Sequence, residues 1–97
     1  MELNSENNVS VGTFVISKAG RDKLRPFIIL KVINSDFVLI ADGDLRKVDK
    51  PKLKKLKHLS VSKLESKFIK DSLDRGEKVS DVQLRNAIAE FSLGQRA

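Results

Sequence analysis

Three apolar segments in the first half of the chain have the β-branched and aromatic composition typical of β-strands. They are VGTFVIS (11–17), PFIILKVI (26–33) and FVLIA (37–41). We expect two further short strands, at 45–48 and 58–61. Pro51 lies between them and cannot donate to a central ladder, so we place it in a connector or at a sheet edge.

Turn-forming residues separate these segments. Asn34-Ser35-Asp36 predicts a short hairpin between the second and third strands. Asp42-Gly43 follows the third strand, and such a pair readily takes the positive φ of a tight turn. The first eight residues are polar, Asn-rich and without periodicity, which predicts a disordered leader over 1–8.

From Ser62 onward the apolar residues recur with the period of an α-helix. Ser62 to Glu65 and Ser80 to Gln83 both fit the capping box that begins a helix. The expected apolar faces are Leu64, Phe68, Ile69 and Leu73 in the first helix, and Val82, Leu84, Ala87, Ile88 and Phe91 in the second. Gly76 and Gly94 stand where the two helices are expected to end.

Strands followed by helices predict an α+β fold. Each helix is too short to be stable alone in water, so we expect the pair to pack on its own sheet. A hairpin that binds a partner is the alternative. The expected organisation is the leader, a sheet domain over 9–61 and a helical hairpin over 62–97.

Positive charge is concentrated in one segment, residues 46–57, which we call the basic ribbon. Its seven cations are offset only by Asp49, so its net charge equals the formal +6 of the whole chain. Such a block repels itself and is stabilised by a polyanion, whose counterions are released on contact. In an extended ribbon we expect Leu53 to point inward and the alternating lysines outward.

A second basic segment, KAGRDKLR (18–25), is here called the basic loop. Lys18, Arg21, Lys23 and Arg25 flank Gly20, and only Asp22 offsets them. We predict that the loop and the ribbon form one RNA-binding surface. Its residues are Lys18, Gly20, Arg21, Lys23, Arg25, Arg46, Lys47, Lys50, Lys52, Lys54, Lys55, Lys57 and His58.

The sequence offers little catalytic chemistry. There is no cysteine, and the single histidine, His58, has no second His to share a metal with, so no metal or cofactor is expected. Asp42 and Asp44 are better explained as turn residues than as an acid–base pair. No phosphate-cradling or nucleophile motif is present. The five phenylalanines lie in strand or helix patterns and are expected in the core, which favours structured RNA over a single-strand stacking platform.

The stretch VGTFVISKAGRDKLRPFIILKVINSDFVLIADG resembles the KOW motif, with Gly20 at the position of its glycine. The order KOW, A-D-G-x-L-R-K and then K-K-L-K-H-L is similar to a group of small bacterial KOW-domain RNA-binding proteins, themselves similar to eukaryotic and archaeal large-subunit ribosomal proteins. Leu24 departs from the pattern, because such loops often carry a second glycine there. The resemblance covers residues 9 to 60 well and the helical region more loosely.

This resemblance implies an SH3-like β-barrel, a cytoplasmic, non-enzymatic protein and a role on ribosomal or other structured RNA. No apolar run in the sequence approaches the length of a membrane span, and no small-molecule substrate is expected. The alternative is a KOW-type module that reaches the ribosome or the transcription machinery through a protein partner. DNA binding is a weaker hypothesis, because the basic residues do not lie on either expected helix and no recognition helix is visible.

Overall fold

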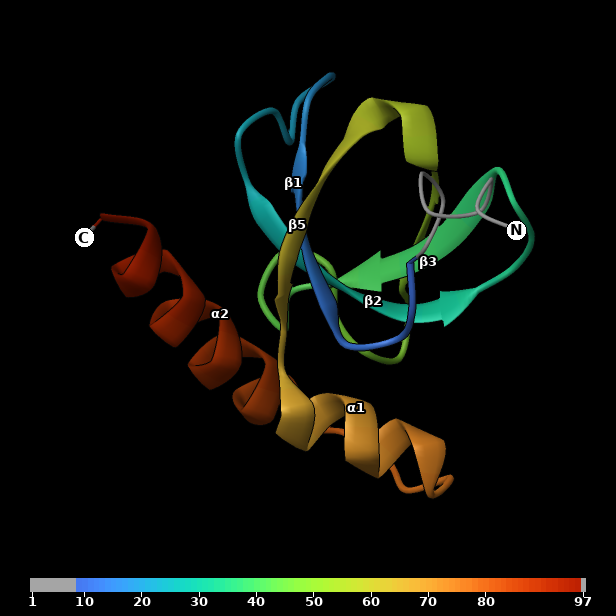
Figure 1. Cartoon of the computed structure of the whole chain (residues 1–97), viewed down its shortest axis with the longest axis vertical. Coiled ribbons are helices and arrows are strands. Elements are labelled where there is room, and N and C mark those ends of the chain that lie inside the picture. The colour runs from blue at the N-terminus through green and yellow to red at the C-terminus, as the bar shows by residue number, and fades with distance from the viewer. Residues whose placement is uncertain (1–8, 97) are drawn as a thin grey trace.

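A computed structural model describes residues 9–96, so the predicted leader, 1–8, lies outside the described residues. Five antiparallel strands form one open sheet in the order β4-β3-β2-β1-β5, and two helices follow it (Figure 1). This confirms the α+β class. The strands are β1 (Thr13–Ser17), β2 (Pro26–Val32), β3 (Phe37–Ala41), β4 (Lys52–Lys55) and β5 (Leu59–Glu65).

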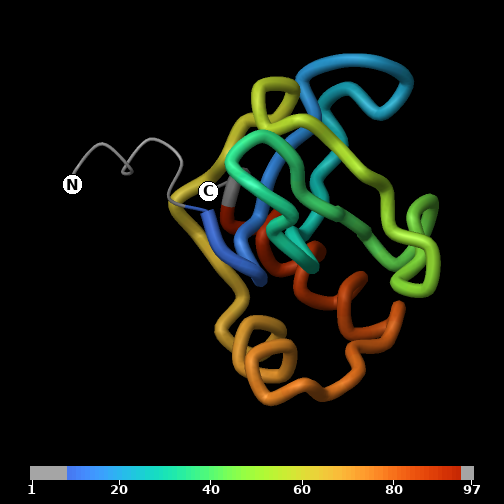
Figure 2. The backbone as a smooth tube through the Cα atoms, turned by 90° about the vertical axis from the view of Figure 1, so that its right-hand side faces the viewer, coloured from blue at the N-terminus to red at the C-terminus, as the bar shows by residue number. Residues whose placement is uncertain are grey.

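The two edge strands of the sheet are consecutive in the chain. A single 3₁₀ turn, η2 (Leu56–His58), joins β4 to β5, although these strands flank opposite sides of the sheet. The sheet must therefore bend back toward itself, and Figure 2 shows the chain curling in this way. The register shifts at Thr13/Val15 and Ile29/Lys31, and irregular pairing of this kind adds twist to a strand and helps it bend.

Core residues lie on both faces of the central part of the sheet. On the concave face, Val15, Phe27, Ile29, Val38, Ile40 and Leu59 form one core cluster. On the other face, Phe14, Ile28 and Ala41 pack with residues from the helical region, namely Ile69, Val79, Leu84 and Phe91. Because side chains alternate along a strand, burial on both sides explains the apolar run from Phe27 to Leu30 in β2.

The helices are α1 (Lys67–Asp74) and α2 (Asp81–Arg96). The expected packing of the helices on their own sheet is confirmed, and the Phe14 and Phe91 rings stack with centroids 4.4 Å apart. The capping box at the start of α2 is also confirmed: the Ser80 amide donates to Gln83 Oε1 at 2.9 Å and the Gln83 amide to Ser80 Oγ at 3.1 Å. None of the helices within 9–96 combines the length and the apolar character that crossing a bilayer requires.

Several local predictions are wrong. Residues 62–65 belong to β5 and do not begin a helix, because they pair with β1; Ser66 caps α1 instead, accepting the Ile69 amide at 3.2 Å. Residues 45–48 form bends and the start of a turn, and not a strand. Gly94 does not end α2, since a glycine weakens a helix by only about 1 kcal/mol.

Another wrong prediction concerns β4, where Leu53 is 55% exposed. Lys52 pairs with Ile40 and Lys54 with Val38, so these lysines share the concave face of the sheet and are half-buried. Leu53 therefore faces outward. The register with β3, and not the polarity of the ribbon, sets which side chains face in.

Candidate nucleic-acid interface

The fold brings the basic loop and the basic ribbon side by side. At one end the Lys18 amide donates to the His58 carbonyl oxygen at 2.9 Å. At the other end the Asp22 carboxylate lies 3.4 Å from Lys52 Nζ and 3.5 Å from the Arg46 guanidinium. Two segments that are separate in sequence are thus in contact at two places along their length.

Asp22 joins the two basic segments. Its side chain is only 8% exposed and contacts two cations of the ribbon. A carboxylate buried between two cations holds them in place and cancels part of their charge. Arg46 and Lys52 therefore position the loop on the ribbon, and they contribute less to the outward field than their charge in the sequence indicates.

Asp42 organises the turn that leads into the ribbon. One of its carboxylate oxygens accepts the amides of Asp44 and Arg46, each at 2.9 Å, and the other accepts Arg25 Nε at 3.0 Å. The same Arg25 guanidinium donates to Asp44 at 2.9 Å. Side-chain bonds to these amides replace a β-ladder, which explains the missing strand at 45–48. The turn interpretation of Asp42 and Asp44 is confirmed.

This turn is also braced by α2. Arg85 donates to the Gly43 carbonyl oxygen at 2.7 Å, and the Val48 amide donates to the Asp81 carboxylate at 2.7 Å. Gly43 has φ +79°, and a Cβ at this position would collide with the carbonyl oxygen of Asp81. The A-D-G-D-L-R segment is thus scaffold that connects the sheet, the loop and the helix.

The remaining cations of the predicted surface have no carboxylate within 4.0 Å among residues 9–96. All are exposed except Lys54, which is half-buried. They are Lys18, Arg21, Lys23, Lys47, Lys50, Lys54, Lys55 and Lys57. His58 is half-buried in η2, and its carbonyl oxygen holds the base of the loop.

The tip of the basic loop has an unusual backbone. Gly20 has φ +80° and Leu24 has φ +70°, the only non-glycine residue with positive φ in the described part of the chain. Leu24 is 75% exposed, and its amide donates to the Ser17 carbonyl oxygen at 2.7 Å. The residue that departs from the KOW pattern therefore keeps a conformation that suits glycine.

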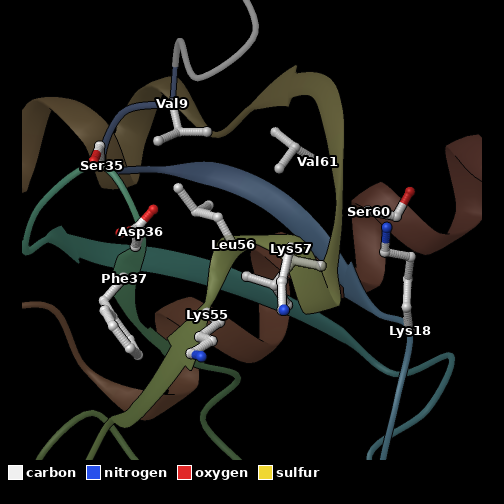
Figure 3. A pocket seen from close by; sticks show the side chains of 11 residues that line it. Val9, Lys18, Ser35, Asp36, Phe37, Lys55, Leu56, Lys57, Ser60 and Val61 are labelled. Carbon is white, nitrogen blue, oxygen red and sulfur yellow. The ribbon is translucent and has the colours of Figure 1, made fainter.

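A pocket of about 760 Å³ opens where the end of the ribbon meets β5 and the 34–36 turn (Figure 3). Lys18, Lys55 and Lys57 contribute to its wall. The sequence did not predict the other lining residues, because they come together only when η2 brings β4 next to β5. These are Val9, Ser35, Asp36, Phe37, Leu56, Leu59, Ser60 and Val61.

The phenylalanines only partly follow the sequence prediction. Phe14, Phe27 and Phe91 are buried in the core as expected. Phe68 is 56% exposed on α1, which contradicts that prediction. Phe37 is half-buried and lines the pocket, with Lys55 Nζ 5.8 Å from its ring centroid, a distance within the cation–π range.

Comparisons with known proteins add no assignment: no protein-family model matches the chain, and no curated protein matches it.

Proposed function

We propose that the protein is a non-enzymatic RNA-binding protein that docks on structured RNA, such as ribosomal RNA, through the basic loop and the basic ribbon. The observation that carries this proposal is the contact between the two segments, which together hold eight cations without described carboxylate partners, seven of them exposed. Lysines at such a density bind phosphates and do not read sequence, so shape recognition of folded RNA is the mode expected.

We further propose that the sheet is an SH3-like barrel of the KOW type. The strand order β4-β3-β2-β1-β5 and the single 3₁₀ turn between the two edge strands support this assignment. Glycine at position 20 with φ +80° supports the KOW resemblance, because that motif carries a glycine in this loop. In such a barrel the basic loop and the end of the ribbon, which meet at Lys18 and His58, would contribute cations to one surface.

The direct test is a charge reversal at three exposed positions, Arg21→Glu, Lys55→Glu and Lys57→Glu, in one variant. We expect it to lose binding to an RNA stem-loop while its circular dichroism and thermal unfolding stay those of the parent. The matched control reverses Lys63, Lys67 and Lys78, which are also exposed but lie outside both basic segments. Equal loss in both variants would show that only net charge matters and that the assigned surface is wrong.

Salt dependence gives an independent measure of the same contact. If roughly five to seven phosphates are neutralised, log K should fall against log salt concentration with a slope of about −4 to −6. A slope near zero would contradict phosphate binding. Treating a cell lysate with RNase distinguishes RNA binding from the alternative, a protein partner. If the protein stays in the heavy sucrose fractions after RNase, a protein partner is favoured; if it leaves them, direct RNA contact is favoured.

A further inference from the structure

We propose that the pocket between η2, β5 and the 34–36 turn binds one unpaired nucleotide of the RNA, with guanine as the preferred base. This inference rests on the proposed function and adds the element of RNA structure that is recognised. The pocket's volume, about 760 Å³, lies within the roughly 300–1,000 Å³ of small-ligand sites.

The charge at the pocket wall points to a phosphate. Lys18 comes from the start of the basic loop, whereas Lys55 and Lys57 come from the end of the basic ribbon. Three like charges placed around one hollow repel one another, and a bound anion relieves that repulsion. The pocket is also continuous with the proposed RNA surface, since these lysines belong to both.

The inner surface of the pocket suits a base. Val9, Leu56, Leu59 and Val61 supply apolar surface, and Val61 is 41% exposed although it lies in a strand. Phe37 lies at one side of the pocket, with its ring turned toward Lys55 (Figure 3). Bases inside a duplex are covered by their neighbours, so only an unpaired nucleotide can place its base here.

Asp36 distinguishes the base. It is the only acidic residue among the lining residues, and its carboxylate forms no hydrogen bond or ion pair with the residues that the structure describes. Its backbone is held in place, because the Asp36 carbonyl oxygen accepts the Leu56 amide at 2.8 Å and its own amide donates to Asn34 at 2.8 Å.

Guanine carries two adjacent donors on its Watson–Crick edge, the ring N–H and the exocyclic amino group, which match the two oxygens of a carboxylate. Uracil and adenine lack this pair. A nucleotide thus presents an anion to the lysines and donors to Asp36 at once. An acidic peptide would bring carboxylates toward Asp36, so its chemistry fits less well.

The test compares three RNA stem-loops that differ at one position of the stem: fully paired, with a bulged guanosine, and with a bulged uridine. We expect the parent protein to bind the guanosine bulge on the order of tenfold more tightly than the paired stem, by fluorescence anisotropy. The Asp36→Asn variant should reduce the preference for guanosine over uridine severalfold, with little change for the paired stem.

Val61→Glu and Val32→Glu form a matched pair of variants. Both valines are exposed to a similar extent in strands, 41% and 37%, but only Val61 lines the pocket. Val61→Glu should abolish the advantage of the bulged stem, and Val32→Glu should keep it. Titration of the unmodified protein with GMP, followed by NMR, provides a readout that does not depend on any variant: the amides of Asp36, Leu56 and Ser60 should shift more than with UMP or inorganic phosphate.

Equal affinity of the parent for paired and bulged stems would overturn the pocket inference and leave the proposed function intact. Salt-independent or undetectable binding to all three stems would remove both. If a polyglutamate peptide shifted the pocket amides while GMP and the bulged stem left them unchanged, the pocket would be a peptide site and the inference would be wrong.

Discussion

Replacement of Leu24 by glycine should stabilise the protein, although it removes a large side chain. Leu24 has φ +70°, a left-handed conformation that costs an L-residue about 1–2 kcal/mol. Its side chain is 75% exposed, so little buried apolar surface is lost. Glycine also increases the conformational freedom of the unfolded chain, which offsets about 0.4–1 kcal/mol of the stabilisation. The expected net gain in the free energy of unfolding is therefore about 0.5–1 kcal/mol.

Urea unfolding followed by circular dichroism measures this gain as a shift of the midpoint of roughly 0.3–0.5 M. Leu24→Ala is the matched control, because it removes the same side chain and keeps the Cβ that conflicts with positive φ. Its midpoint should not rise. If glycine proved no more stable than alanine at this position, the backbone of the loop would not be strained in solution.

Four further variants test the scaffold. Asp22→Asn should lower the free energy of unfolding by about 1–2 kcal/mol, because the loss of a buried anion leaves two cations unpaired. The same change should raise RNA affinity and steepen its salt dependence. Thermal unfolding measures the first effect, and fluorescence anisotropy at several salt concentrations measures the second. Phe91→Ala should cost about 3–4 kcal/mol in urea unfolding, since it removes a buried ring stacked on Phe14. Gly43→Ala should cost more than about 2 kcal/mol in the same assay, because its Cβ would collide with the Asp81 carbonyl oxygen. Gly20→Ala is its control: Gly20 also has positive φ but has open space at Cβ, so this change should cost about 1–2 kcal/mol.

Local signals predicted the elements whose causes are local. The strand 37–41 is bounded by turn residues on both sides and was found with the expected limits. The capping box at Ser80 satisfies backbone groups within one turn of helix, so the sequence alone indicates it. The similar pattern at Ser62 failed because Glu65 pairs with Thr13, a contact across the chain that local sequence does not reveal.

The same distinction applies to the candidate site. The concentration of charge in the basic ribbon is visible in the sequence, and so is the glycine of the loop. The sequence does not show which cations face a carboxylate, because only the folded sheet brings Asp22 together with its partners Arg46 and Lys52. The pocket was missed for the same reason, since Asp36 and Val61 meet only after the two edge strands approach each other.

The bonds from α2 to the turn at Gly43 and Val48 mean that the C-terminal third of the protein is not a detachable appendage. A fragment ending after β5 would retain every cation of both basic segments, yet the entrance to the ribbon would lose two of its anchors. Affinity for RNA and the integrity of the last helix are consequently linked properties, and a lesion in α2 far from any phosphate can weaken binding.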